Sequence, residues 1–433
     1  MTQSWDKKMN AAVARPRDDR TVGRAQWIAL SLLVLSICIN YMDRGNLSVA
    51  APALSSELHL DPAYTGFLLS AFFWSYATFQ IVSGWLIDRY NVNWVYAAGF
   101  FLWSFATALT GLANTFVELF ALRLLLGMSE SVAYPSYSKI IAGGFPEKQR
   151  GMANALIDAG SKVGPALGMI VGGLILAKFG WRVMFLAIGA TSMIWLVPWC
   201  WVIRKRPVAA AADPGMGAIV SAPGPIPGFA DILRERSAWG TFLGLFAGNY
   251  AWYFLLTWLP SYLIMERHYT TEMMAWFGSL PFWGVAASTI FSGWLSDRFI
   301  ARGGSPTRVR KTFAIAGLVL TTLMLPAAMV NNQVTAMSLL MAAWLAFGLF
   351  SSNIWAITQT LAGPVAAGKW TGMQNAVGNL AGVLAPVVTG FIVKETGRFF
   401  YAFVAVCVVL GIGAVSYLFI VGPVEEIAWP EAM

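Results

Sequence analysis

Residues 84–90 read GWLIDRY and residues 293–299 read GWLSDRF, so two distant stretches of the chain agree at five of seven positions. Each stretch closes an apolar segment, the second one in its half of the chain. A chance match at corresponding places is improbable, and repeated sequence is the signature of repeated structure. We therefore interpret the chain as two copies of one helical bundle.

The composition indicates a protein that crosses a membrane many times. Hydrophobic residues make up 58% of the 433 residues and charged residues only 12%, about half the charged share of soluble domains. Such a chain has too little polar surface to cover a core in water. The composition therefore excludes a cytosolic enzyme, a disordered chain and a nucleic-acid-binding protein.

About 20 apolar residues form a helix that spans the bilayer, and the chain contains twelve such segments. They are residues 26–50, 63–87, 92–113, 116–142, 152–177, 182–203, 239–264, 274–298, 311–330, 335–362, 369–394 and 398–421. We predict an all-α membrane protein with twelve transmembrane helices in two six-helix bundles. The predicted parts are a tail (1–25), a bundle (26–203), a linker rich in Pro and Gly (204–238), a second bundle (239–421) and a tail (422–433).

The placement of Lys and Arg predicts the orientation. Of the 29 Lys and Arg residues, the loops on the outer side hold only Lys178, Arg182, Arg267, Lys394 and Arg398. Basic residues gather on the cytoplasmic side of membrane proteins. We expect both termini to be cytoplasmic, in a bacterial inner membrane.

Charged residues at membrane depth are costly and therefore mark function. The first predicted helix carries Asp43 and Arg44, and the fourth carries Arg123 and Glu130 on one face. Desolvation disfavours the charged form of a buried carboxylate, whereas a nearby arginine favours it. A substrate anion that moves onto the arginine removes that influence, so anion binding and protonation would be coupled.

We accordingly assign Arg44 to a substrate carboxylate, since its planar fork suits that group. Asp43 and Glu130 are assigned to the coupling protons, and Arg123 to a charge partner that rearranges during the cycle. The alternative is that Arg123 and Glu130 merely pair to hold two helices together. In the fifth predicted helix, Asp158 and Lys162 are four residues apart, and a structural pair that neutralises itself is the favoured interpretation.

The motif at 84–90 and 293–299 resembles the loop motif of the major facilitator superfamily, a glycine-led segment that ends in Asp-Arg. The resemblance covers nearly the whole chain and implies two six-helix halves that rock around a central site. It implies a role in folding and gating, not in substrate binding, for Gly84, Asp88, Arg89, Gly293, Asp297 and Arg298.

Residues 41–48 (YMDRGNLS) and 123–130 (RLLLGMSE) resemble motifs of the anion:cation symporter family, which includes galactonate, hexuronate and phthalate transporters. The resemblance implies proton coupling at Asp43 and Glu130. It also implies that Arg44 faces the substrate, helped by Tyr41 and Tyr76. Ser161 and Lys162 stand near the position where galactonate-type members have glutamine, and we count Ser161 as a substrate-binding candidate.

The second half has no charged residue well inside a predicted helix, so it must recognise substrate by hydrogen bonds and aromatic faces. We select Ser352, Trp355 and Asn375 as candidates because they lie near mid-helix. The alternative is that such residues hold helices together or anchor the interface.

We predict a proton-coupled symporter of a small organic anion, with a sugar acid (an aldonate or hexuronate) favoured over an aromatic acid of the phthalate type. An exchanger or uniporter on the same fold, a membrane sensor and an intramembrane enzyme are the alternatives. The cysteines and histidines have no metal-site spacing, so we expect no metal, cofactor or enzyme activity. The expected partners are the anion, protons and the lipid bilayer, and we expect no nucleic acid and a monomer.

Overall fold

The computed structural model describes residues 23–145, 147–205 and 227–429, and they form an all-helical protein. In chain order the elements are α2 (Arg24–Glu57), α3 (Pro62–Arg89), α4 (Val92–Thr110), α5 (Phe116–Glu130), α6 (Ala133–Gly144), α7 (Glu147–Met193), α8 (Leu196–Lys205), α9 (Phe229–Arg234), α10 (Arg236–Met265), α11 (Thr271–Ala301), α12 (Pro306–Thr321), α13 (Met324–Met329), α14 (Gln333–Thr396), α15 (Phe400–Val415) and the π-helix η1 (Ser416–Ile420).

Every segment predicted as a membrane span is helical, but three of them are interrupted. The breaks come at 131–132, 194–195 and 322–323. Each begins four residues before a proline: Pro135, Pro198 or Pro326. Proline cannot donate to the carbonyl four residues earlier, and its ring clashes with that carbonyl. The sequence therefore contained the signal for all three breaks.

Two long helices each join a pair of predicted spans through a glycine with positive φ. Gly180 in α7 has a φ of 80° and Gly363 in α14 has a φ of 61°. Other residues rarely adopt this conformation. Each glycine therefore turns the chain sharply between the end of one span and the start of the next.

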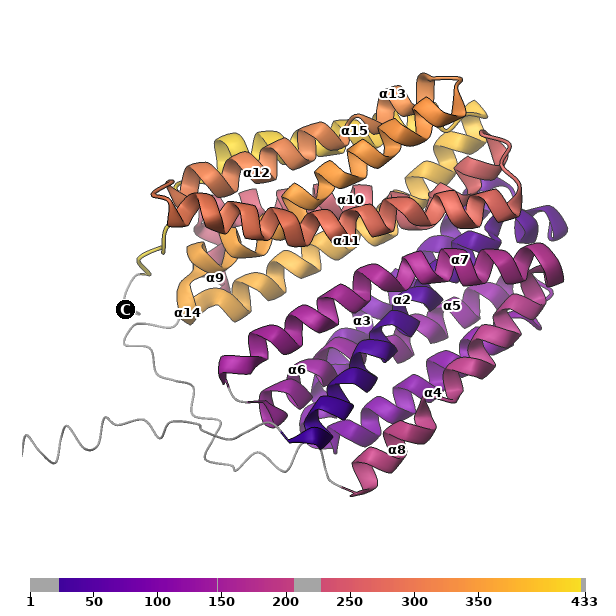
Figure 1. Cartoon of the computed structure of the whole chain (residues 1–433), viewed down its shortest axis with the longest axis horizontal. Coiled ribbons are helices and arrows are strands. Elements are labelled where there is room, and N and C mark those ends of the chain that lie inside the picture. The colour runs from indigo at the N-terminus through magenta and orange to yellow at the C-terminus, as the bar shows by residue number, and fades with distance from the viewer. Residues whose placement is uncertain (1–22, 146, 206–226, 430–433) are drawn as a thin grey trace, which may run out of the picture.

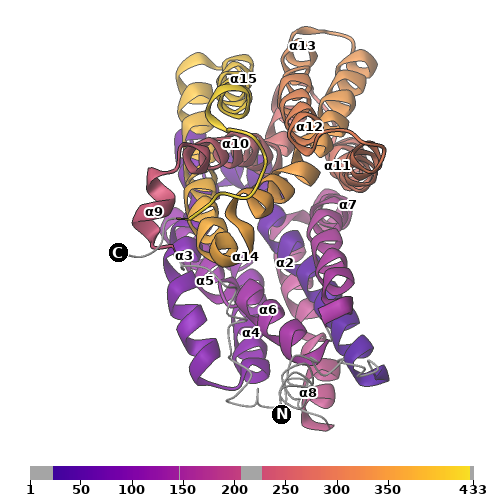
Figure 2. The same cartoon turned by 90° about the vertical axis from the view of Figure 1, so that its left-hand side faces the viewer.

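The helices form two groups, with α2–α8 on one side and α10–η1 on the other (Figures 1 and 2). Among the described residues, nine helical stretches are long and apolar enough to cross a membrane. The count of twelve spans and the limits of the two bundles stay predictions. Parts of the predicted tails and linker (1–22, 206–226 and 430–433) lie outside the described residues.

The two groups pack together at one end, which we call the far end because it is remote from residues 205 and 227 (Figure 1). There α3 meets α14 so closely that a Cβ on Gly66 would lie 2.6 Å from the carbonyl oxygen of Pro386. Lys394 and Asp61 form an ion pair of 2.8 Å across this contact. At the opposite, near end, Gly84, Gly368 and Gly372 have open space where a side chain would begin.

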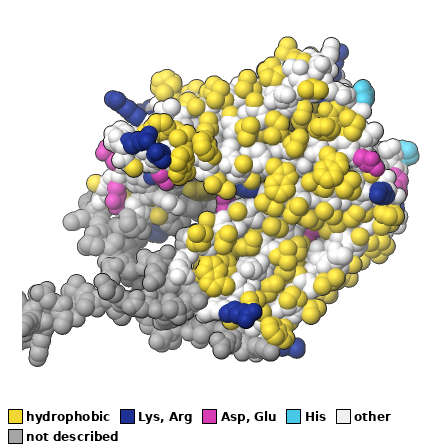
Figure 3. Space-filling model, in the orientation of Figure 1, with side chains coloured by type: hydrophobic (Ala, Val, Ile, Leu, Met, Phe, Trp, Pro, Cys, Tyr) yellow, Lys and Arg dark blue, Asp and Glu magenta, His cyan; other side chains and the backbone are white. Residues whose placement is uncertain are grey.

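The outer surface is largely apolar. Hydrophobic side chains cover most of the face in Figure 3, and the charged ones there lie mainly toward its two ends. Large side chains such as Trp85, Trp94 and Phe291 are about half exposed. An apolar surface of this extent is typical of contact with lipid.

Candidate functional site

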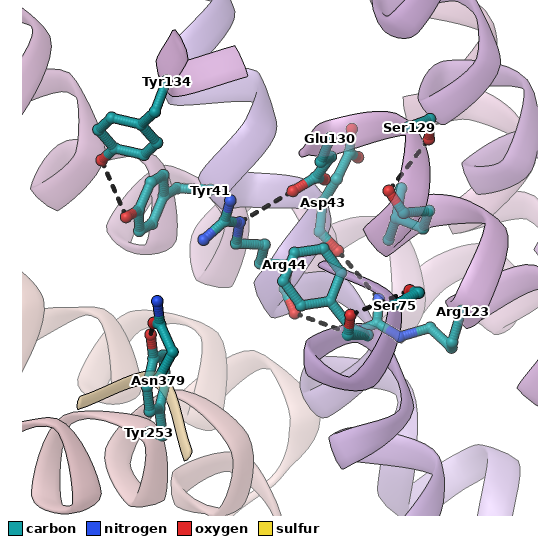
Figure 4. Close-up of polar contacts among 12 residues, drawn as sticks. Tyr41, Asp43, Arg44, Ser75, Arg123, Ser129, Glu130, Tyr134, Tyr253 and Asn379 are labelled. Carbon is teal, nitrogen blue, oxygen red and sulfur yellow. Dashed lines mark hydrogen bonds and ion pairs between the residues drawn. The ribbon is translucent and has the colours of Figure 1, made fainter. Parts of the chain in front are cut away.

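Arg44 lies at the centre of a cluster of ionisable residues inside the first group of helices (Figure 4). Its Nε atom donates to Oε2 of Glu130 at 2.9 Å, so α2 and α5 are joined by an ion pair. The two side chains are 5% and 0% exposed. A charged pair that is so deeply buried depends on its partner, because either charge alone would be costly at this depth.

Three aromatic rings surround the Arg44 guanidinium. Its Cζ atom lies 4.6 Å from the ring centre of Tyr41, 4.8 Å from that of Phe72 and 4.6 Å from that of Tyr76. These are cation–π distances. The Nη2 atom of Arg44 is buried and has no hydrogen-bond partner among the described residues. An anionic oxygen would satisfy this buried donor.

Both predicted proton-carrying carboxylates are buried with one oxygen unsatisfied. Asp43 accepts a hydrogen bond of 3.2 Å from Nδ2 of Asn46 through Oδ1. Its Oδ2 atom and Oε1 of Glu130 have no partner within 3.5 Å among the residues that the structure describes, although Thr107 lies near Asp43 and Asn40 near Glu130. Both nitrogen and oxygen of the neighbouring Asn40 amide are also unpartnered. Buried polar atoms without partners are rare, and a bound proton or ligand would satisfy such atoms.

Arg123 contacts backbone instead of a carboxylate. Its Nη1 and Nη2 atoms donate to the carbonyls of Asp43 at 3.5 Å and of Arg44 at 3.4 Å. Within the described chain, Arg123 has no carboxylate at ion-pair distance, and the partner of Glu130 is Arg44. The alternative in which Arg123 and Glu130 form a static pair is therefore wrong for this conformation.

The predicted pair in α7 forms, but it is loose. The Nζ atom of Lys162 lies 3.7 Å from Oδ1 of Asp158, and it also lies 5.3 Å from the ring centre of Trp252 on α10. Ser161, by contrast, is buried and donates to the carbonyl of Asp158 at 2.7 Å. Its hydroxyl is thus engaged with its own helix, so the structure gives no contact between Ser161 and the Arg44 cluster.

In the second group, none of the three predicted candidates forms a hydrogen bond with a residue of the Arg44 cluster in the described structure, and their role in substrate binding stays a prediction. Ser352 donates to the hydroxyl of Ser292 at 2.9 Å and so ties α14 to α11, as the helix-joining alternative predicted. Trp355 packs against the core and is half-buried. Asn375 is exposed.

Of the residues labelled in Figure 4, Tyr253 and Asn379 face the cluster from the second group. The hydroxyl of Tyr253 donates to Oδ1 of Asn379 at 3.1 Å, and the Tyr253 ring packs on Phe73 with ring centres 4.4 Å apart. Within the first group, the sequence did not predict Phe72 and Tyr134, which contact Arg44 and Tyr41. Phe72 lies four residues before Tyr76 and hence on the same helix face, a signal that was available. Tyr134 shares a hydroxyl hydrogen bond of 3.1 Å with Tyr41.

The repeated motif lies at the near-end termini of α3 and α11. Asp297, Arg89 and Arg298 are exposed, and the guanidinium of Arg298 lies 5.2 Å from the ring centre of Trp294. The side chain of Asp88 lies outside the described part of the structure. Among the residues that are described, neither arginine of the motif forms an ion pair, so the gating role of this motif stays a prediction.

Comparison with known proteins gives one family. The model of the Major Facilitator Superfamily matches residues 33–303 and 271–432. A D-galactonate transporter of Escherichia coli O6:H1 is 30% identical over 94% of this chain and 97% of its own length. A probable galactarate/D-glucarate transporter of Bacillus subtilis is 29% identical over 97% of this chain and 96% of its own length. A probable sulfoacetate transporter of Cupriavidus necator is 30% identical, with 92% and 94% covered.

A solved structure shares the fold. It is a bacterial homolog of the human lysosomal transporter Spinster in an inward-facing conformation, with a TM-score of 0.78 and 19% sequence identity. The match covers 93% of this chain and 98% of that one. At this level of identity the likeness concerns the fold alone.

Proposed function

The chain belongs to the Major Facilitator Superfamily, and from this premise we propose that it couples uptake of a small organic anion to protons by alternating access. The anion is a sugar acid, as the names of the galactonate and galactarate/D-glucarate relatives suggest. In this proposal twelve helices cross a bacterial inner membrane, with both termini in the cytoplasm, and the protein works as a monomer.

The buried ion pair between Arg44 and Glu130 is the observation that carries the proposal. One edge of the guanidinium binds Glu130, and the Nη2 atom has no partner in the described chain. A substrate carboxylate that takes the fork in bidentate fashion would compete with Glu130 for Arg44. Once separated from its cation, buried Glu130 is more stable as the neutral acid and takes up a proton. Anion binding and proton binding thus become linked.

Asp43 and Arg123 are a second carboxylate and a second cation beside the Arg44–Glu130 pair. Asp43 has one unsatisfied buried oxygen, and Arg123 rests on the carbonyls of Asp43 and Arg44. Arg123 therefore lies beside Asp43 and beside Arg44, which exchanges Glu130 for the substrate in this proposal. A small rotation would let it stabilise whichever carboxylate is ionised, and the charge of the site would stay balanced through the cycle.

Symport is tested with purified protein in vesicles, with D-galactonate and galactarate as the probes. In symport, addition of the acid to one side draws protons across the membrane with it, and a pH electrode records the change. An imposed pH gradient should also drive uptake against the concentration gradient. Uptake without proton movement would favour the exchanger or uniporter instead.

The ion pair between Asp61 and Lys394 is expected to act as a latch that holds the far end closed. It joins the two groups, and it holds the pKa of Asp61 below its ordinary value because Lys394 hydrogen-bonds the carboxylate. The latch is therefore complete above the ordinary carboxyl pKa and is lost as the pH falls through the lowered one. Since both side chains are partly exposed, its effect is modest and weakens with salt.

Asp61→Asn is expected to open the far end about two- to fivefold more often, as an exposed pair of this kind allows. The readout is maleimide labelling of a single cysteine at Ala63, which is buried at this contact, in a background without the three native cysteines. Lys394→Gln should act alike, and the double exchange Asp61→Lys with Lys394→Asp should restore slow labelling. Equal labelling rates in all variants would show that the pair is no latch.

A further inference from the structure

Lys162 is a second cation that faces the gap between the two groups of helices, and the mechanism above does not use it. Met169 and Gly173, on the same face of α7, contact Gly278 and Ala275 of α11. Residues seven and eleven positions apart share a helix face. The face that carries Lys162 therefore points toward the second group, where its Nζ atom lies over the ring of Trp252.

Asp158 neutralises this cation only in part. The distance of 3.7 Å between the charged atoms is well beyond the 2.7–2.9 Å or so of a charge-assisted hydrogen bond. The Asp158 side chain is 62% exposed and that of Lys162 is 22% exposed, so water weakens the attraction further. Within the described residues, the Lys162 ammonium donates no hydrogen bond. It is a half-buried cation whose donors are available to a ligand.

Lys162 and Arg44 border the same space from two helices. Helix α7 packs tightly on α2, since a Cβ on Gly164 would lie 2.7 Å from Cβ of Tyr41. The two helices run in parallel. Arg44 follows Tyr41 by three residues and Lys162 precedes Gly164 by two, so their backbones are offset by about 7–8 Å along the helix axes. Packed helix axes are about 8–10 Å apart. These dimensions place the backbones of the two cationic residues on the order of 10 Å apart, a separation that a ligand with a carboxylate at each end can span.

The neighbouring residues Trp252 and Tyr253 of α10 connect the two positions. Trp252 lies beneath Lys162, while Tyr253 lies opposite Tyr41 and Arg44 (Figure 4). A ligand in front of this helix turn would therefore have one cation near each of its ends. The hydroxyl of Tyr253 and the amide of Asn379 lie on the second-group side of this space and suit the hydroxyl groups of an open sugar chain.

We propose that the site takes a dianionic open-chain sugar acid with a carboxylate at each end, held by Arg44 at one end and by Lys162 at the other. This inference rests on the proposed function and narrows its substrate class from sugar acids in general to those with two carboxylates. Lys162 is the residue that sets the specificity. Its ammonium is a compact charge that adjusts to the second carboxylate, which replaces the loose contact with Asp158.

The test compares galactarate with galactonate, which have six carbons each but differ in the charge of one end. Binding is measured as the rise in melting temperature with ligand concentration, because a ligand of the folded form stabilises it. Lys162→Gln is expected to lower the affinity for galactarate about tenfold or more, as the loss of a hydrogen bond between charged groups predicts. The affinity for galactonate should change less than about twofold, and Lys162→Arg should restore most of the affinity for galactarate.

Two controls isolate the second carboxylate. Lys178→Gln removes a lysine from an exposed position of the same helix and should leave both affinities unchanged. Malonate, a dianion that is too short to span the two cations, should bind equally to wild type and Lys162→Gln. The melting temperature of each variant without ligand shows that it is folded.

The outcomes separate this inference from the proposed function. If wild type binds both acids and Lys162→Gln weakens both equally or neither, the dianion proposal is wrong and the anion transporter stands. If galactarate alone depends on Lys162, the proposal holds. If wild type binds and transports neither acid, the sugar-acid function and the dianion proposal both fail.

Discussion

Replacement of Arg44 by alanine is expected to abolish binding of the sugar acid. Each hydrogen bond between charged groups contributes about 1.5–3 kcal/mol, so loss of a bidentate pair weakens binding by about 100-fold or more. The Tyr41, Phe72 and Tyr76 rings would remain, but they carry no positive charge that could replace the guanidinium as the partner of a carboxylate. Ligand-dependent melting and counterflow of labelled acid in vesicles measure the effect.

Arg44→Lys is the matched variant, because it keeps the charge but removes the planar fork. We expect it to retain the fold and to bind the acid weakly. Truncation to alanine also leaves Glu130 buried without a partner, which costs about 3–5 kcal/mol of stability unless the carboxyl group takes up a proton. The alanine variant should therefore melt at a higher temperature at low pH than at neutral pH. An affinity equal to that of wild type would refute the carboxylate assignment.

Neutral replacement of either buried carboxylate is expected to uncouple transport from protons. Glu130→Gln and Asp43→Asn keep the size of each side chain but can neither bind nor release a proton. A pH gradient should then drive no accumulation above the equilibrium level. Counterflow of labelled substrate needs no net proton movement, so it should survive in at least one of the two variants.

Glu272→Gln is the control for these variants, since it removes a carboxylate from an exposed position at the start of α11. It should accumulate substrate as wild type does. Wild-type accumulation in both Glu130→Gln and Asp43→Asn would remove the coupling roles from these residues. Loss of counterflow in both would instead indicate that the two carboxylates are needed to hold the site together.

The helices were predictable from the sequence because a bilayer admits few alternatives. A spanning segment must bury all of its backbone hydrogen bonds within itself, so long apolar runs become helices. Even the interruptions at Pro135, Pro198 and Pro326 follow from local chemistry. Proline alone was not decisive, however, because the helices that contain Pro165 and Pro260 are not broken near those prolines. Neighbouring helices decide whether the freed backbone groups find partners.

The candidate site was predictable in part. Charged residues at membrane depth identified Asp43, Arg44, Arg123 and Glu130, and the structure brings these four together. The residues of the second half that face the cluster were not predictable. Uncharged polar residues are frequent in membrane helices, and most of them form hydrogen bonds between helices. Ser352 does so by bonding to Ser292, whereas Tyr253 and Asn379 face Arg44 (Figure 4).

The sequence by itself determined the class of protein, the positions of its helices and the half of the chain that contains the charged residues at membrane depth. These follow from hydropathy and from the cost of a charge in lipid, which are properties of each segment alone. Only the tertiary structure decided which carboxylate Arg44 binds, that Arg123 rests on backbone, and that Lys162 faces the second group. Those choices depend on how helices distant in sequence are rotated against one another, and a few ångströms decide which two charges meet.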